Sequence, residues 1–306
     1  MEQLEIRNLS FSYPDAVRET IADVSFSISK GEYVLLCGNS GCGKTTLLRH
    51  LKSVLTPTGS RRGEILYNGV PLEQVDGAKQ ASDIGYVMQN PDDQIVTDKV
   101  WHELAFGLEN LGVSRETIGL RVAEMASFFG IQSWYHRDIS QLSGGQKQLL
   151  NLASIMAMQP EILILDEPTA QLDPIAASDF LNTLKKINQE LGITVLITEH
   201  RAEDIFPVAD RVLVMERGHL AANAGPREIG HSLFDARSPL FPMLPAPMRS
   251  FYQCGGTGTA PLTVREGRNW LTDVFGEKKP AVRTLPPLPE LPKTELALHI
   301  ENVWLR

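Results

Sequence analysis

The sequence predicts an α/β protein whose mainly parallel sheet is covered by helices on both faces. Residues 33–37, 162–165 and 194–198 are unbroken apolar runs, as in strands that are buried on both sides. A helical pattern starts at Lys44, after the first run, and another covers residues 175–190, between the second and third. Strands that alternate with helices in this way are typical of a parallel sheet with helices on each face.

Other segments fit around this predicted core. Residues 4–11 and 22–29 alternate apolar and polar side chains, as half-buried strands do. Residues 65–69 predict a further strand that ends in a turn. From about residue 98 to 160 the pattern is helical, with apolar side chains at three- and four-residue spacing.

The composition is that of a globular protein that buries a core. The 306 residues are 42% hydrophobic and 22% charged, and the net charge of -8 argues against nucleic-acid binding through phosphate contacts. No apolar run has the length that spans a bilayer, and the N-terminal residues MEQLEIRN lack the pattern of a signal peptide. The three cysteines are too few and too poorly spaced for a disulfide framework or a zinc site, which favours a reducing, cytoplasmic setting.

The character of the chain changes after about residue 225. Eleven of the nineteen prolines lie between Pro226 and Pro292. This density predicts an extended, semi-rigid spacer over residues 226–293 in place of regular structure. Within it, residues 261–271 allow one short helix capped by Thr263. A proline-rich ligand for a peptide-binding module is the alternative.

A phosphate-binding pattern, G-x-x-x-x-G-K-[ST], joins the first buried run to the helix that follows it. Its residues are Gly38, Asn39, Ser40, Gly41, Cys42, Gly43, Lys44 and Thr45, with Thr46 next in the helix. The glycines let successive backbone N–H groups turn toward phosphate oxygens, and the helix N-terminus adds its positive end. We expect Lys44 to reach the β- and γ-phosphates of a nucleotide and Thr45 to place its hydroxyl on Mg²⁺. A glycine-rich turn without a ligand is the alternative.

Two carboxylates follow the second buried run. Asp166 and Glu167 stand at the carboxyl end of a predicted strand, where ligands bind in sheets of this kind. We expect Asp166 to hold Mg²⁺, directly or through water. Glu167 points elsewhere and is expected to polarise the water that attacks the γ-phosphate. Strands often end in acidic residues, so this pair alone is a weak indication of a site. Together with the phosphate loop it is a strong one.

A second glycine-rich segment, L-S-G-G-Q at residues 142–146, opens a long helical stretch. The small residues Ser143, Gly144 and Gly145, followed by Gln146, leave backbone amides bare at a helix N-terminus, which predicts a second anion site. A plain helix start capped by Ser143 is the alternative. That alternative explains the serine but not the paired glycines, which weaken a helix.

Taken together, these motifs resemble the nucleotide-binding domain of ABC-type transport ATPases over roughly residues 2–220. The resemblance implies a P-loop NTPase fold over residues 1–225, with a mainly parallel core sheet, an antiparallel β subdomain and a helical subdomain that carries the signature L-S-G-G-Q. It implies an enzyme that binds and hydrolyses ATP with Mg²⁺. It also implies that two such domains face each other and that each closes its signature over the ATP bound to the other.

The resemblance assigns roles to residues outside these motifs as well. Tyr13 matches the aromatic residue that stacks on adenine, although a core aromatic is the alternative. Gln89 matches the glutamine that contacts Mg²⁺ and the attacking water and signals to the membrane subunits. Asp173 matches the aspartate that communicates between the two sites, and His200 matches the switch histidine at the γ-phosphate. The expected catalytic residues are Lys44, Gln89, Glu167 and His200, and the expected Mg²⁺ ligands are Thr45, Gln89 and Asp166.

Finer features resemble the ATPases of energy-coupling-factor (ECF) importers, which take up vitamins and metal ions. These features are V-M-Q-N-P-D-D-Q-I-V at residues 87–96 and T-E-H-R at residues 198–201. In that class the residues after the glutamine face coupling helices of a transmembrane subunit, often through an acid–arginine contact. Asp92 and Asp93 are candidates for this contact, with a solvated acidic turn as the alternative. As a departure, Leu149 and Leu150 stand where relatives commonly carry an arginine, which puts an ion pair at that helix in doubt.

The expected function is that of an ATP-hydrolysing subunit, peripheral at the cytoplasmic face of the cell membrane. It would energise an importer for a vitamin, a vitamin precursor or a metal ion, together with a transmembrane coupling subunit and a separate substrate-binding membrane subunit. A soluble ABC ATPase that acts on ribosomes or DNA is the alternative, and the acidic balance and absence of basic runs disfavour it. A regulatory binder without hydrolysis is disfavoured because Glu167 and His200 are both present.

The last residues of the chain resemble the first. LHIENV at residues 298–303 aligns with LEIRNL at residues 4–9, with leucine, isoleucine and asparagine identical in register. Any exposed strand alternates in this way, so a chance match is the alternative. We expect residues 294–306 to be the first strand of a second ABC domain, truncated, that follows the proline-rich spacer in a tandem ATPase.

Overall fold

The computed structural model describes residues 2–199 and 202–276. His200 and the residues from 277 onward, including the proline-rich stretch 285–292 and the predicted strand 294–306, lie outside the described residues. Met1–Gly267 form one compact unit, and a second unit begins at Arg268. Within the described part of the chain, no helix is both long and apolar enough to cross a membrane.

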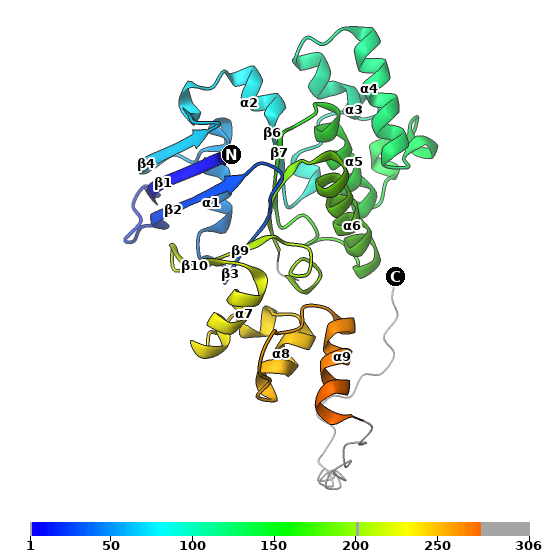
Figure 1. Ribbon diagram of the computed structural model, residues 1–306. Coiled ribbons are helices and arrows are strands. Elements are labelled where there is room, and N and C mark those ends of the chain that lie inside the picture. The colour runs from blue at the N-terminus through cyan, green and yellow to red at the C-terminus, as the bar shows by residue number, and fades with distance from the viewer. Residues whose placement is uncertain (1, 200–201, 277–306) are drawn as a thin grey trace, which may run out of the picture. The chain divides into compact units, whose positions relative to one another are not determined.

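The core is a six-stranded sheet in the order β10-β9-β3-β8-β7-β6 (Figure 1). Neighbouring strands pair in parallel from β6 to β9, and β10 pairs with β9 in the antiparallel sense. The strands are β3 (Tyr33–Gly38), β6 (Ile84–Val87), β7 (Ile162–Asp166), β8 (Thr194–Thr198), β9 (Arg211–Glu216) and β10 (His219–Ala224). The prediction of parallel strands at residues 33–37, 162–165 and 194–198 is confirmed.

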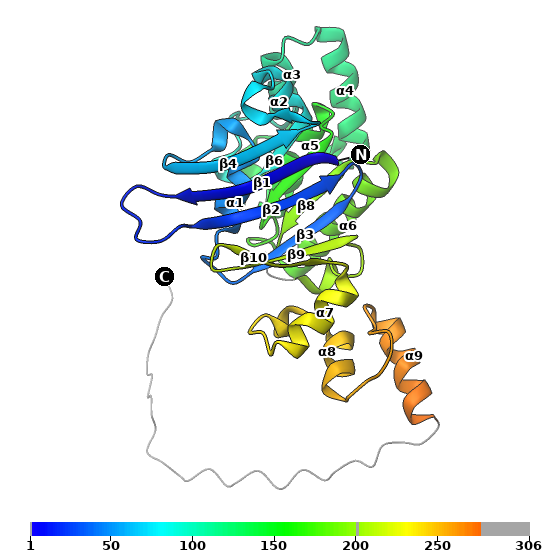
Figure 2. The same cartoon turned by 60° about the vertical axis from the view of Figure 1, so that its left-hand side comes forward.

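A second, antiparallel sheet has the strand order β2-β1-β4-β5 (Figure 2). Its strands are β1 (Glu2–Ser12), β2 (Ile21–Ser29), β4 (Ser60–Tyr67) and β5 (Val70–Pro71). Alternate residues of β1 and of the core strands, such as Leu4, Ile6, Leu36 and Ile164, share one buried apolar cluster with Leu47 of α1 (Lys44–His50). This shared core attaches the antiparallel sheet to the face of the parallel sheet that carries α1.

The remaining α-helices before residue 199 are α2 (Gly77–Asp83), α3 (Val100–Asn110), α4 (Arg115–Phe128), α5 (Gly144–Ala157) and α6 (Pro174–Leu191). Helices α5 and α6 lie on the side of the parallel sheet away from the antiparallel sheet, and α3 and α4 pack beyond α5 (Figures 1 and 2). The helical pattern predicted from about residue 98 to 160 is not one continuous helical stretch. After α4, Gly130 has a φ of 66°, and residues 132–141 contain two short 3-10 turns before α5 begins.

The prediction of extended structure from residue 226 is wrong for residues 226–253, which contain α7 (Pro226–Asp235) and α8 (Ala246–Gln253). The short helix predicted within residues 261–271 is present as α9 (Val264–Phe275). The prolines of α7 and α8 lie in their first turns, where the missing N–H has no intrahelical partner to lose. Leu233, Met248 and Phe251 are buried, so α7 and α8 have an apolar face. The capping role of Thr263 is confirmed, because its Oγ1 accepts a hydrogen bond from the Glu266 N–H at 3.2 Å.

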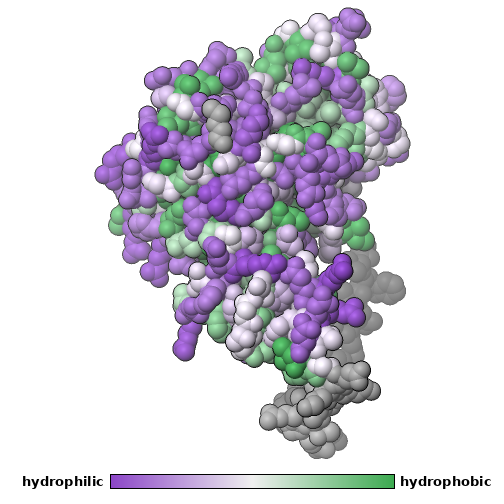
Figure 3. All heavy atoms as spheres, viewed as in Figure 1, coloured by the Kyte–Doolittle hydropathy of each residue, from purple (hydrophilic) through white to green (hydrophobic). Residues whose placement is uncertain are grey.

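On the face shown in Figure 3, hydrophobic residues are scattered among hydrophilic ones. Such a surface is ordinary for a protein that meets water over most of its area.

Candidate nucleotide-binding site

The phosphate loop connects β3 to α1 at the carboxyl end of the parallel sheet. Its backbone has positive φ at Gly38 (155°) and Gly43 (107°). A Cβ at Gly38 would lie 2.3 Å from the carbonyl oxygen of Met215, and one at Gly43 would lie 2.6 Å from that of Thr20. Glycine is therefore required at both positions by close backbone approach as well as by conformation.

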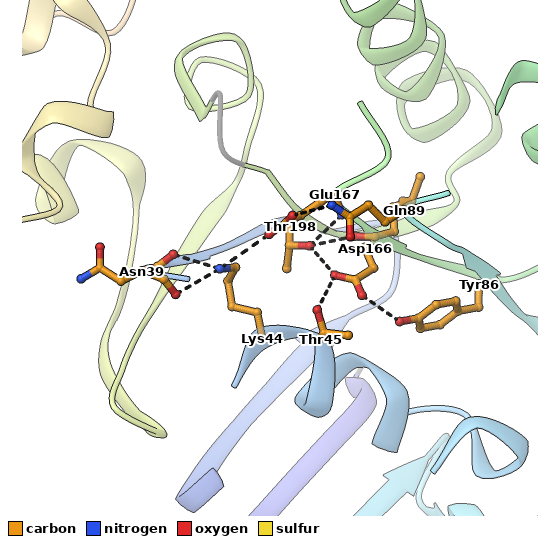
Figure 4. Close-up of polar contacts among 10 residues, drawn as sticks. Asn39, Lys44, Thr45, Tyr86, Gln89, Asp166, Glu167 and Thr198 are labelled. Carbon is orange, nitrogen blue, oxygen red and sulfur yellow. Dashed lines mark hydrogen bonds and ion pairs between the residues drawn. The ribbon is translucent and has the colours of Figure 1, made fainter. Parts of the chain in front are cut away.

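Lys44 is buried inside this loop, with 5% of its surface exposed. Its Nζ donates to the carbonyl oxygens of Gly38 at 2.9 Å and Asn39 at 3.3 Å (Figure 4). It also lies 3.7 Å from Oε1 of Glu167. The Lys44 ammonium is thus surrounded by oxygen atoms of two carbonyl groups and one carboxylate. It is well placed to bind a phosphate, because phosphate oxygens are acceptors of the same kind and carry more negative charge.

Asp166 receives three hydroxyl hydrogen bonds at the end of β7. Thr45 Oγ1 and Thr198 Oγ1 both donate to Asp166 Oδ1 at 3.1 Å, and Tyr86 OH donates to Oδ2 at 3.3 Å. Burial raises the pKa of Asp166, and the hydroxyl donors act in the opposite direction. The structure thus brings Thr45 and Asp166 together, as the sequence predicts.

These oxygen donors fit Mg²⁺. Among the described residues no cluster of three or more histidine, cysteine, aspartate or glutamate side chains could hold a metal ion by itself. Mg²⁺ is usually bound by one or two protein oxygens together with water and substrate phosphates. A site made of the Thr45 hydroxyl, the Asp166 carboxylate and the Gln89 amide matches that preference, because all three can offer hard oxygen ligands.

Glu167 follows Asp166 but its backbone turns away from the strand. Its φ is 47°, a left-handed conformation that is uncommon outside glycine. Its N–H donates to the backbone oxygen of Thr198 at 3.1 Å and lies 3.0 Å from Thr198 Oγ1. Gln89 Nε2, which follows β6, donates to Glu167 Oε2 at 3.2 Å. The two neighbouring carboxylates therefore have different partners, which suits them to different tasks.

The loop, Glu167 and Gln89 line one pocket of about 430 Å³. Its lining residues are Thr20, Ser40, Gly41, Gly43, Lys44, Thr45, Thr46, Gln89 and Glu167. Thr20 belongs to no motif, and its sequence neighbourhood offers no signal that predicts this position. Asn39 and Cys42 line a separate pocket of about 610 Å³ with residues of the β9–β10 hairpin. These two predicted loop residues are not among those that line the nucleotide pocket, and the Cys42 N–H donates to the carbonyl oxygen of Asn39 at 3.2 Å.

Tyr13 lies at the edge of the nucleotide pocket, just beyond β1. Its hydroxyl is 3.1 Å from Thr46 Oγ1, and its ring packs edge to face on Phe11 with the centroids 4.9 Å apart. The ring is 38% exposed, whereas Phe11 is buried. The alternative of a core aromatic is therefore wrong for Tyr13, and a flat exposed ring is available for stacking.

The signature segment starts α5 with a reciprocal cap. Ser143 Oγ accepts from the Gln146 N–H at 3.3 Å, and Gln146 Oε1 accepts from the Ser143 N–H at 2.9 Å. A Cβ at Gly144 would meet nothing within 4 Å, so no packing contact requires that glycine. The structure therefore contains the helix start capped by Ser143 that the alternative predicts. The cap does not by itself account for the paired glycines, because the space next to Gly144 is open.

Two of the predicted motifs lie away from the nucleotide pocket. Ser143, Gly145 and Gln146 line another pocket of about 230 Å³, together with residues of α6. Asp173 caps α6 by accepting hydrogen bonds from the N–H groups of Ile175 and Ala176. The structure therefore brings together the phosphate loop, Asp166, Glu167 and Gln89, while the signature and Asp173 form a second locus on the same domain.

Asp92 and Asp93 lie in a short 3-10 turn, Pro91–Asp93, that follows Gln89. Asp92 is 63% exposed and accepts a hydrogen bond from Lys147 Nζ at 2.6 Å. An ion pair at helix α5 thus exists through Lys147, although Leu149 and Leu150 occupy the stretch where the family resemblance predicts an arginine. The acidic turn is solvated, and it remains accessible to a partner.

The fold and the site together define a P-loop nucleoside-triphosphate-binding domain. A family model described as ABC transporter matches residues 21–170. A protein of Methanosarcina acetivorans described as an ABC transporter ATP-binding protein is 39% identical over 226 residues, which are 74% of this chain and 68% of that protein. The chain belongs to the ABC transporter ATP-binding family, whose domains of this kind bind and hydrolyse ATP.

Other relatives and solved structures agree. A protein of Bacillus anthracis with the same description is 43% identical over 301 residues, 98% of this chain and 53% of that protein. The structure of cbiO1 from Clostridium perfringens, part of the ABC transporter complex cbiONQ, is 30% identical with a TM-score of 0.68, covering 78% of this chain and 94% of that one. A dimeric ATP-binding cassette in a post-hydrolysis state with ADP and Pi is 23% identical with a TM-score of 0.63, and concerns the fold alone.

These comparisons confirm the predicted ABC ATPase fold. The chain spans about half the length of the first curated relatives that it matches, at 53% and 48% of their residues.

Proposed function

We propose that this domain hydrolyses ATP to drive a membrane importer of the ECF type. The observation that carries the hydrolytic part is the convergence of Lys44, Thr45, Gln89 and Glu167 on one pocket. Asp166 lies beside this pocket and accepts a hydrogen bond from the Thr45 hydroxyl. Cation, metal-binding oxygens and a candidate base are thereby present at the end of one sheet, as phosphoryl transfer requires.

The residues of the site have separable roles in this proposal. Lys44 binds the β- and γ-phosphates and stabilises the charge that develops on them. Thr45, Asp166 and Gln89 hold Mg²⁺, which supplies charge neutralisation at the phosphate oxygens when it is bound with ATP. A γ-phosphate at Lys44 competes with Glu167 for the ammonium, 3.7 Å away. Glu167, once released from that ion pair, orients the attacking water and accepts its proton. His200 is assigned to the γ-phosphate.

Adenine recognition is assigned to Tyr13. Its exposed ring stands next to Thr46, which lines the pocket, and offers an apolar face at the mouth of the site. Backbone N–H groups of the phosphate loop are assigned to the phosphate oxygens.

A second ATP-binding domain completes the site. The signature residues 143–146 and Asp173 lie at a locus separate from the nucleotide pocket of the same domain, which supports closure over the ATP of a partner domain. Two of the curated relatives are about twice as long as the part of them that this chain matches. This length and the similarity of residues 298–303 to 4–9 support a second ABC domain in the same polypeptide, after a spacer. A second copy of this chain would supply the same surface.

The importer class is supported by two observations. The chain is 30% identical to cbiO1, which is part of the complex cbiONQ. Asp92 and Asp93 form an exposed acidic turn directly after Gln89, so a transmembrane subunit bound there would sense the catalytic site through few intervening residues. On this proposal the domain is peripheral at the cytoplasmic face of a membrane, and a separate membrane subunit selects a vitamin, a vitamin precursor or a metal ion.

Fractionation of the native cells tests this proposal. The protein should sediment with membranes and be released as a complex with a transmembrane protein by mild detergent. Recovery with ribosomes or DNA would contradict the importer and would favour a soluble ABC ATPase. Phosphate release from ATP by the purified protein tests the hydrolytic part independently of any membrane subunit.

A further inference from the structure

Two buried amide side chains of α5 hold the backbone on each side of Gln89. Gln148 Nε2 donates to the carbonyl oxygen of Met88 at 3.1 Å, one residue before Gln89. Asn151 Nδ2 donates to the carbonyl oxygen of Pro91 at 3.4 Å, two residues after it. Since Gln148 and Asn151 are one helical turn apart, a single face of α5 grips this segment at both ends.

The segment is also closed on itself. Gln94 Oε1 accepts from the Met88 N–H at 3.0 Å, and Gln94 Nε2 donates to the carbonyl oxygen of Tyr86 at 2.8 Å. Residues 88–94 therefore form a compact loop whose position is set by α5. Gln89 is exposed near the start of this loop, and its Nε2 donates to Glu167 Oε2 at 3.2 Å.

Stability alone does not explain amides at these two positions. Gln148 and Asn151 are both 0% exposed. Gln148 Oε1 and Asn151 Oδ1 have no hydrogen-bond partner in the part of the chain that the structure describes. Each amide satisfies one backbone carbonyl group but leaves its own oxygen without a partner, so its net contribution to stability is small.

We propose that Gln148 and Asn151 are positioning residues, which hold Gln89 opposite Glu167 and make hydrolysis depend on the position of α5. This inference rests on the proposed roles of Gln89 and Glu167. Helix α5 begins at the signature, which in the proposed function closes over the ATP of a partner domain. Movement of α5 shifts the carbonyl groups that its amides hold, and Gln89 moves with them. Closure at one ATP site is then reported to the hydrolytic residues of the other.

A double-mutant cycle on the full chain tests this coupling. The variants are Gln148→Met, Gln89→Ala and the combination, each assayed for phosphate release, ATP affinity and thermal unfolding. Gln148→Met should lower kcat about threefold to tenfold, the worth of one hydrogen bond, with KM and nucleotide affinity unchanged. In the Gln89→Ala background it should lower kcat no further, because the residue through which it acts is already gone.

Gln80→Met is the matched control. Gln80 is a buried glutamine of α2 whose amide donates to the carbonyl oxygens of Leu72 and Val75, away from Gln89. It should change the unfolding temperature but not kcat. Asn151→Ala provides the same cycle through the second amide if Gln148→Met does not give a folded protein.

The outcomes separate this inference from the proposed function. A lower kcat in Gln89→Ala, together with an undiminished loss from Gln148→Met in that background, would overturn the positioning role and leave the function intact. Unchanged kcat in Gln148→Met and Asn151→Ala would do the same. Unchanged kcat in Gln89→Ala would overturn the role assigned to Gln89, and the inference with it.

Discussion

Lys44 Nζ lies 3.7 Å from Glu167 Oε1, so the cation expected to bind phosphate and the carboxylate expected to activate water are already paired. Lys44 is buried and Glu167 is nearly so, which makes their attraction stronger than that of a surface pair. Phosphate and carboxylate compete for the same ammonium. Mutation of the two residues should consequently affect different quantities: ATP affinity for Lys44 and the rate of turnover for Glu167.

Lys44→Ala should abolish ATP binding. The loop loses the buried positive charge that faces the β- and γ-phosphates, and Glu167 would be left to repel them. Equilibrium titration with a fluorescent ATP analogue measures the effect. Lys79→Ala, which removes an exposed lysine of α2, is the control and should bind normally. Normal affinity in Lys44→Ala would remove this residue from phosphate binding.

Glu167→Gln should bind ATP normally and lower turnover by about 10²–10⁴-fold, the usual worth of a positioned general base. The amide keeps the shape of the side chain but cannot accept a proton from water. Phosphate release under single-turnover conditions measures the change, with Glu124→Gln on the exposed face of α4 as the control. Near-normal phosphate release from Glu167→Gln would exclude Glu167 as the base.

The parallel core and most of the site could be predicted because their signals are local. The strands at residues 33–37, 162–165 and 194–198 are predominantly apolar, and Lys44, Asp166 and Glu167 come shortly after the ends of two of them. Strand β6 carries no such signal. It has four residues, and Gly85 is there because Ile155 and Leu163 pack against it, which is a tertiary requirement.

The predictions that the structure contradicts also concern features that depend on tertiary packing. Proline density predicted a spacer, but the prolines of α7 and α8 occupy first turns, and these helices are stabilised by burial of Met248 and Phe251 that no local pattern reveals. Thr20 reaches the nucleotide pocket because Gly43 packs on its carbonyl oxygen, across 23 residues of sequence. Positions of this kind are determined by the packing of distant segments, so a sequence pattern does not identify them.

Lys52 should make stability depend on pH. Burial lowers its pKa from 10.5 to about 8, and its Nζ donates to the carbonyl oxygen of Ile84 at 2.6 Å. Because the folded-state pKa is depressed, the stabilising contribution is complete above pH 10.5 and is lost as the pH falls through about 8. Wild type should therefore gain free energy of unfolding relative to Lys52→Met as the pH rises through this window.

Urea unfolding of both proteins at several pH values across that window measures the difference. Lys79→Met, which removes an exposed lysine of α2, is the control. Parallel stability curves for wild type and Lys52→Met would show that Lys52 keeps an ordinary pKa in the folded protein.

Asp92→Lys with Asp93→Lys should leave ATP binding intact and weaken association with the transmembrane partner. Both residues lie on an exposed turn, so the fold should tolerate the changes. Asp92 also pairs with Lys147, so Asp93→Lys alone is the cleaner variant, because it keeps that ion pair. Detergent pull-down of the transmembrane subunit measures the effect.

Glu64→Lys with Glu73→Lys is the matched control for this charge reversal. These two exposed carboxylates, which lie in or near the antiparallel sheet, also pair with arginine side chains. The control protein should associate normally. Undiminished recovery of the partner by Asp93→Lys and by the double variant would exclude this turn as the contact.

The specific ATPase rate of the 306-residue chain should rise with protein concentration. Signature residues 143–146 lie at a locus separate from the pocket that contains Lys44 and Glu167, so a closed site needs a second domain. When a second copy supplies it, dilution separates the pair, whereas a covalent tether would keep the local concentration high. Phosphate release measured over about a hundredfold range of protein concentration should show a rising, then saturating, specific rate.

Mixing two inactive variants gives this prediction a second and sharper form. Lys44→Ala retains an intact signature but should not bind ATP, and Ser143→Arg retains the nucleotide pocket but places a bulky charge at the start of α5. Each should be inactive alone, because neither homodimer contains a complete site. Their mixture forms dimers in which the pocket of one chain meets the signature of the other, so part of the activity should return. A flat specific rate on dilution, with undiminished activity in Ser143→Arg alone, would mean that one domain hydrolyses ATP unaided.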